Sequence, residues 1–260
     1  MLTASPALSY TASIAGRFAR DALALGQGEV CAQFHRSIYL RLPGERYACV
    51  GDASLGRGPL NALVEDFTPA AIGARISVDV QDVWSAPPAP PHAAPDLTAL
   101  RAAARGHVPS EGLGCLVMDE HNGLSGHAHP ALDAIERWLV GNALANEAEI
   151  LIGLGPGLTP SGDDFLGGVM IALHYVQRKT QAQGLWRWLK PRLSRTSPIS
   201  GAHLEAAAAG EGHEAQHEAL EHLFQREPGW DGVLTRLDAI GHCSGWDALA
   251  GAVIVAKSFS

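Results

Sequence analysis

The run Gly153–Gly168, with the sequence GLGPGLTPSGDDFLGG, combines the residue types that build a binding site for a small anion. Its glycines allow positive φ angles and let a ligand approach the backbone, and its hydroxyl side chains offer hydrogen-bond donors. The apolar residues that follow predict a helix, whose first turn leaves N–H groups free to bind a phosphate or a carboxylate. We expect the anion to be held by glycine and hydroxyl residues of this run: Gly155, Gly157, Thr159, Ser161 and Gly162.

Two adjacent carboxylates in the same run, Asp163 and Asp164, are the candidate catalytic residues. Neighbours on a helix point about 100° apart, so we expect the two to have different roles. One can accept a hydrogen bond from a substrate or hold Mg²⁺, which is the one cofactor that this pattern suggests, while the other anchors the loop. The alternative interpretation is a well-capped helix, because acidic residues in the first turn stabilise the helix dipole.

Two loops elsewhere in the chain offer further polar groups for the same ligand. The segment Thr196–Gly201 precedes an alanine-rich run, and Ser200 there is expected to contribute its hydroxyl to the pocket. The segment Gly56–Asn61, in the first half of the chain, adds the amide of Asn61, which can recognise a carboxamide or a carboxylate. Each segment has an ordinary alternative: the first is a common helix cap, and the second is a plain turn.

A fourth segment repeats part of the first motif. Ser244-Gly-x-Asp247 has the pattern of Ser161-Gly-x-Asp164, 83 positions further along the chain. The two turns can therefore face each other across one pocket, with both helix N-termini directed at the same anion, and Ser244 and Asp247 complete the set of candidate binding residues. A close helix crossing, permitted by the glycines, explains the same pattern equally well.

The composition describes a globular chain with an acidic balance. Of the 260 residues, 47% are apolar and 18% are charged, and Lys+Arg 19 against Asp+Glu 27 gives a net charge of −8. Because no basic run is present, neither nucleic acid nor a membrane is an expected partner. The chain has no apolar segment of the ~18 residues that a membrane span needs, and no signal-peptide pattern. We therefore expect a cytoplasmic protein.

The cysteines and histidines match no established motif for a metal or a nucleophile. The four cysteines lie far apart, so we expect reduced thiols and disfavour a zinc site. His121, His127 and His129 fall in a segment that we expect to be a solvated loop. His213 and His217 are expected on an exposed helix face. The glycine patterns of P-loops and Rossmann folds and the G-x-S-x-G nucleophile turn are also missing.

The apolar periodicity predicts an α+β chain in which strands come first and helices later. A short helix is expected to end near Gly26, followed from Gly28 by antiparallel strands. The proline-rich segment 85–95 reads as an extended linker, so we expect a β-rich domain at 1–95 and a mainly helical domain at 96–260. Helices are expected at about 96–106, 130–145, 162–178, 182–193, 200–209, 213–226, 231–239 and 244–257.

Four segments in this order, GPLNALV, GLGPGLTPSGDDFLGG, TSPISGAHLEAAAAGE and GHCSGWDALAG, resemble the family of bacterial proteins typified by AllH, a subunit associated with oxamate carbamoyltransferase in allantoin degradation. The resemblance extends from about Gly28 onward. It implies transfer of a carbamoyl group between carbamoyl phosphate and oxamate, in a complex with partner subunits. Both compounds are small anions, in agreement with the anion site expected from the residues.

Two functions of other classes also fit the residues. The first is a Mg²⁺-dependent hydrolase of a phosphorylated or ribosylated small molecule, since carboxylates at helix starts can hold divalent ions. The second is a non-catalytic subunit that senses an anion through the same motif.

Overall fold

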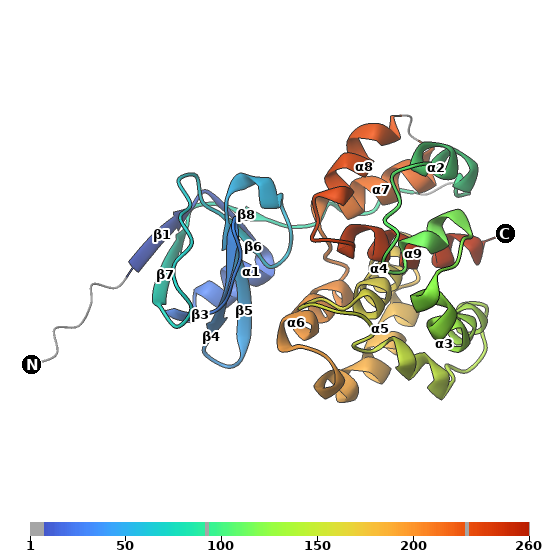
Figure 1. Ribbon diagram of the computed structural model, residues 1–260, viewed down its shortest axis with the longest axis horizontal. Coiled ribbons are helices and arrows are strands. Elements are labelled where there is room, and N and C mark those ends of the chain that lie inside the picture. Colours follow the sequence, from blue (N-terminus) through green and yellow to red (C-terminus); the bar gives the residue numbers. More distant parts are fainter. Residues whose placement is uncertain (1–7, 92–93, 227–228, 260) are drawn as a thin grey trace, which may run out of the picture. The chain divides into compact units, whose positions relative to one another are not determined.

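The computed structural model describes residues 8–91, 94–226 and 229–259. The chain forms two compact units, which divide between Ala86 and Pro87. This division falls near the start of the proline-rich segment, where prolines lack the N–H donors that helices and sheets require, whereas our expected boundary lies at its end. Strands occupy the first unit and most helices the second (Figure 1), which confirms an α+β chain.

One mixed sheet builds the first unit. Its strands are β1 (Leu8–Ala12), β2 (Ile14–Gly16), β3 (Gly28–Gln33), β4 (Ser37–Leu42), β5 (Arg46–Gly51), β6 (Asn61–Leu63), β7 (Arg75–Val80) and β8 (Val83–Trp84). They are ordered β1-β7-β3-β4-β5-β6-β2-β8. Because only Ser13 separates β1 from β2, and these strands pair at opposite ends of that order, the sheet must curl.

The strand directions correct part of the expectation. The pairs β3–β4 and β4–β5 are antiparallel as expected, the second closed by a turn at the predicted Pro43-Gly44. The pairs β1–β7, β2–β8 and β5–β6 are parallel, because longer connections bring these strands together and no local turn signal reveals them. The helix before Gly26, α1 (Arg17–Leu23), is short and buries Ala19 and Ala22 in the core of this unit.

Helices make up the second unit. They are α2 (Leu97–Ala104), α3 (Gly123–Leu139), α4 (Ser161–Tyr175), α5 (Lys179–Leu189), α6 (Pro198–Ala208), α7 (Glu214–Gln225), α8 (Trp230–Asp238) and α9 (Ser244–Lys257). Short 3₁₀ helices are η1 (Ala53–Leu55) in the first unit and η2 (Gly114–Met118), η3 (Asn146–Leu151) and η4 (Lys190–Arg195) in the second. Most of these elements begin or end within a few residues of the expected ones.

Helix α3 differs from the expectation at its start. It begins at Gly123 and contains Pro130, so His127 and His129 lie on an exposed helical face and not in a loop. Asn122 accepts the Ser125 N–H and Ser125 Oγ accepts the Asn122 N–H, which forms a capping box. Because Pro130 lies inside the helix, it removes the hydrogen bond that an N–H would donate to the Gly126 carbonyl oxygen, and its ring crowds that carbonyl group. The expected loop was wrong for His127 and His129 because the cap starts the helix at Gly123 and burial of Ala128, Ala131 and Leu132 stabilises it.

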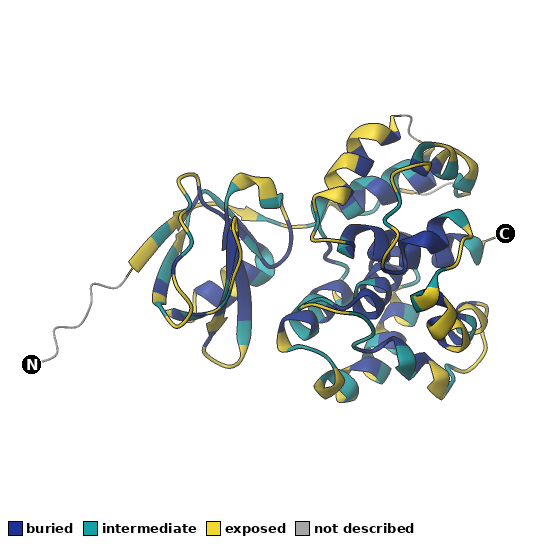
Figure 2. Cartoon of the chain, viewed as in Figure 1, coloured by how far each residue is buried: buried dark blue, intermediate teal, exposed yellow. Residues whose placement is uncertain are grey.

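Helices α4 and α9 form the centre of the second unit, where Figure 2 shows them in dark blue. All residues of α9 from Gly245 to Ala256 are buried. The two helices touch backbone to backbone, since a Cβ on Gly168 would lie 1.9 Å from the Ala248 carbonyl oxygen and one on Gly251 would lie 2.1 Å from that of Phe165. Among the described residues, no helix has both the length and the apolar character to cross a membrane.

Candidate functional site

The starts of α4 and α9 meet through a reciprocal pair of contacts. The Ser161 hydroxyl, at the first residue of α4, hydrogen-bonds the carboxylate of Asp247. The Ser244 hydroxyl, at the first residue of α9, hydrogen-bonds the carboxylate of Asp164. The two Ser-Gly-x-Asp turns therefore lie against each other, and the glycine-mediated helix crossing that was the alternative is present. A shared pocket with one anion between them stays a prediction.

Thr159 joins this arrangement from the loop before α4. Its Oγ1 lies 3.1 Å from Ser244 Oγ, and it also hydrogen-bonds Asp164. We call Thr159, Asp164 and Ser244 the Asp164 corner. Two hydroxyls and one carboxylate thus converge where both helices begin.

Asp164 carries the most unusual polar atom in the described part of the chain. Its Oδ2 is buried and has no hydrogen-bond partner there, although another part of the residue reaches the surface. Burial raises the pKa of Asp164 well above its ordinary value, and the carboxylates of Asp247 and Asp163 raise it further. A buried acceptor without a donor is costly, so a donor from a bound molecule would stabilise it.

Asp163 has the opposite character, because every contact of its carboxylate serves the fold. Its Oδ1 accepts the Gly153 N–H at 3.0 Å, and its Oδ2 accepts the hydroxyls of Ser200 at 2.8 Å and of Thr196. Burial raises its pKa despite these three donors. Asp163 therefore ties residues 153–160, which we call the glycine loop, and the start of α6 to α4. A Mg²⁺ site shared with Asp164 would have to break these bonds.

Asp247, in the first turn of α9, is the acidic partner of Ser161. It is 1% exposed, and its Oδ1 accepts the Leu113 N–H at 2.5 Å, with a further bond from the Gly114 N–H. Burial raises the pKa of Asp247 to about 6, against the opposing effect of these donors. Its polar capacity is used to fix the η2 segment against α9.

The glycine loop supplies donors that remain free. Gly153, Gly155 and Gly157 have φ angles of 72°, 110° and 93°, a region that favours glycine. In the described ranges, no hydrogen bond engages the N–H of Gly155 or of Gly157, and Gly157 is exposed. The Gly162 N–H, which the sequence assigned to the anion, instead donates to the Leu154 carbonyl oxygen at 2.9 Å.

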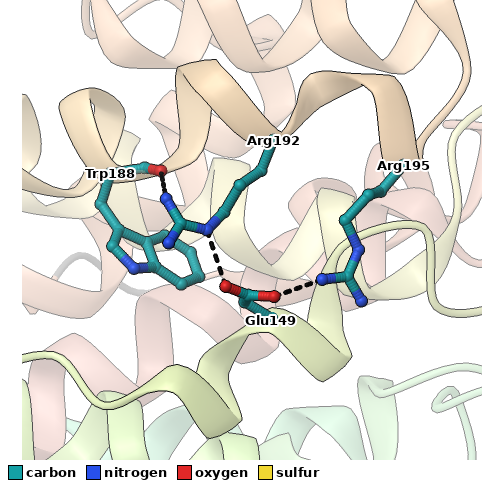
Figure 3. A network of polar contacts seen from close by, with 4 residues as sticks. All are labelled: Glu149, Trp188, Arg192 and Arg195. Atoms are coloured by element: carbon teal, nitrogen blue, oxygen red, sulfur yellow. Dashed lines mark hydrogen bonds and ion pairs between the residues drawn. The ribbon is translucent and has the colours of Figure 1, made fainter.

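A cationic network adjoins this loop from η4 (Figure 3). Glu149 accepts hydrogen bonds from both Arg192 and Arg195, and these arginines lower its pKa. The carbonyl oxygen of Arg195 lies 2.4 Å from where a Cβ on Gly153 would be, so the backbone of Arg195 contacts the loop. No spacing along the chain indicates a role for these arginines, because their partner lies 43 and 46 positions away.

Asn61 does not join the other candidates in any contact that the structure shows. It lies in the first unit, where its Nδ2 donates to the Gly56 carbonyl oxygen at 3.0 Å and to that of Leu55 at 3.4 Å. These bonds close the turn before β6. The expected exposed face of α7 is also wrong in part, since His217 is buried and its Nε2 accepts the Gly212 N–H at 3.0 Å.

Comparison with known proteins finds one similarity, which lies within the second unit. No curated protein and no solved structure matches this chain. A family model described as "Oxamate carbamoyltransferase subunit AllH" matches residues 151–256, which include three of the four segments that carry the resemblance. The chain is therefore AllH-like from the start of the glycine loop to the end of α9.

Proposed function

We propose that this chain is a subunit of a carbamoyltransferase that binds a small anion bearing a carbamoyl group, such as carbamoyl phosphate or oxamate. The family description supports the general assignment, because it names a subunit of an oxamate carbamoyltransferase. The specific assignment rests on one observation: the buried Oδ2 of Asp164 lacks a hydrogen-bond donor. Both substrates carry an NH₂ group that can supply such a donor.

In this proposal, the Asp164 corner recognises the carbamoyl NH₂. A carboxyl oxygen can accept an N–H, and the Thr159 and Ser244 hydroxyls hydrogen-bond the same Asp164 carboxyl group. Because Oδ2 is buried, an NH₂ group would reach it only when neighbouring side chains move, and the bond would then be strong. Asp163 then has a positioning role, since it orients the loop and α6 through three bonds.

The anionic end of the substrate would lie along the glycine loop. The free N–H groups of Gly155 and Gly157 can bind a phosphate or carboxylate oxygen, and the positive ends of two helix dipoles favour the charge. Gly155 packs against Ser161, three residues before Asp164, so both ends of a small molecule can be held by neighbouring parts of one motif. Fixed donors of this kind also stabilise charge that develops during carbamoyl transfer.

A ligand-binding experiment tests the proposal. Thermal shift and calorimetry are carried out on the full chain with carbamoyl phosphate, oxamate, inorganic phosphate and Mg²⁺. We expect carbamoyl phosphate or oxamate to stabilise the wild-type protein, and Asp164→Asn to weaken this effect because its amide has one acceptor oxygen where the carboxylate has two. The matched control is Asp133→Asn, since Asp133 is an exposed residue of α3 that pairs with Arg137.

Other outcomes would favour the alternatives. Stabilisation by phosphate alone, unchanged in Asp164→Asn, would contradict carbamoyl recognition and favour an anion-sensing subunit. Binding of Mg²⁺ without a carbamoyl compound, lost in Asp164→Asn, would favour the hydrolase.

A carbamoyl-transfer assay of the chain alone should show no activity, because a subunit of this kind requires its partners.

A further inference from the structure

Glu111, His242 and Cys243 form a cluster of three different metal-ligating side chains beside the start of α9. One ligand atom from each lies within 4.8 Å of the other two. His242 Nε2 and Glu111 Oε2 are 3.1 Å apart. The members come from chain positions up to 132 residues apart, which is why the spacing of the cysteines gave no indication of a zinc site.

The chemistry of the three donors selects the metal. A thiolate, an imidazole and a carboxylate are the ligands that Zn²⁺ prefers, whereas Mg²⁺ favours oxygen ligands alone. Bonds of ~2.0–2.3 Å place the ligands of one tetrahedral zinc ion roughly 3–4 Å apart, so small side-chain rotations would suffice here. Three protein ligands leave a fourth position for water, as in catalytic zinc sites.

The cluster is open to a cation. Glu111 and His242 are exposed, so an ion can enter from solvent, while Cys243 is only 9% exposed. As a simple ion pair, the exposed Glu111 and His242 would contribute little to stability.

We propose that Glu111, His242 and Cys243 bind one Zn²⁺ ion next to the Asp164 corner. Cys243 directly precedes Ser244, so the ion would lie beside the residues assigned to the carbamoyl group. The three ligands belong to two segments, the one before η2 and the one before α9, and the ion would link them. This proposal does not depend on the proposed function, because metal binding is measured without a substrate.

Titration of the chelator-treated full chain with Zn²⁺ tests the site. We expect calorimetry to show one Zn²⁺ ion per chain, and Co²⁺ used as a spectroscopic probe to give the charge-transfer absorption of a cobalt–thiolate bond. Cys243→Ser should abolish that absorption, and His242→Asn should lower zinc affinity by more than about tenfold, since loss of an outer-shell partner alone typically costs that much. Because His242 is exposed, its variant should fold normally.

Matched controls separate this site from adventitious binding. Cys31→Ser removes an exposed thiol of the first unit, and His121→Asn removes another exposed histidine, so both should bind Zn²⁺ as the wild type does. The absence of zinc binding by the wild type would overturn the proposal. Equal affinities of the wild type, His242→Asn and Cys243→Ser would overturn it as well.

Discussion

Gly168 of α4 and Ala248 of α9 are in backbone contact: a Cβ on Gly168 would lie 1.9 Å from the Ala248 carbonyl oxygen. The reciprocal contact joins Gly251, 83 positions after Gly168, to Phe165, 83 positions before Ala248. The same spacing of 83 separates Ser244 and Asp247 from Ser161 and Asp164. The close approach of the helices therefore accompanies the reciprocal contacts at their starts. Two similar helix starts are thus joined by reciprocal contacts.

Substitution of Gly168 by alanine tests this close packing. The added methyl group would collide with backbone atoms, which cannot move as a flexible side chain would. We expect Gly168→Ala to lower the free energy of unfolding by about 3 kcal/mol or more, measured by urea denaturation. Gly184→Ala in α5 is the control: a Cβ there meets no atom within 4 Å, so this variant should gain about 0.5–1 kcal/mol. Equal stabilities of the two variants would refute the backbone contact.

Asp163→Ala tests the role of Asp163 as a positioning residue. The substitution leaves the Gly153 N–H and the hydroxyls of Ser200 and Thr196 without their common acceptor. We expect a loss of about 2–3 kcal/mol in the free energy of unfolding, and faster hydrogen exchange at Gly153. Thr196→Val removes one of these bonds and should cost about 1 kcal/mol. A stability of Asp163→Ala equal to that of the wild type would exclude the positioning role.

The pH dependence of stability should report the buried carboxyl group of Asp247. Its pKa is about 6 in the folded chain and about 4 when unfolded, so the folded state holds the proton more tightly. The resulting stabilisation is complete below about pH 4 and is lost as the pH rises through 6. We expect the free energy of unfolding to fall by up to about 3 kcal/mol for this reason, measured by urea denaturation at several pH values. This fall should be absent in Asp247→Asn.

The exposed residue Asp133 provides the control for this pH dependence. Asp133→Asn should keep the wild-type profile between pH 4 and 6. If Asp247→Asn follows the same profile as the wild type, Asp247 does not retain its proton in the folded chain.

Local signals predicted the helices of the second unit well, and distant contacts account for what the sequence did not reveal. The hydroxyl and proline residues around Ser161 and Pro198 mark helix starts within a few positions, so the motif was placed correctly on its helix. The donors to Asp247 come from Leu113, 134 positions away, and no pattern along the chain predicts such a partner. For the same reason, the sequence assigned Gly162 to an anion although its N–H is bonded within the loop.

Arg195 should contribute to binding of the anionic end of the substrate. It contacts the glycine loop through its carbonyl oxygen, and its guanidinium group is paired with Glu149, whose carboxylate is shared with Arg192. Because one carboxylate is shared by two arginines, it does not neutralise both of them. The remaining positive charge would attract an anion bound on the loop. We therefore expect Arg195→Ala to weaken binding of carbamoyl phosphate by about tenfold in calorimetry, a loss of about 1.4 kcal/mol. The difference from the wild type should be smaller at high salt, where exposed charges are screened. The control Arg137→Ala removes an exposed arginine of α3 and should bind as the wild type does. Equal affinities of the two variants would place the anion away from η4 and leave the loop N–H groups as its main donors.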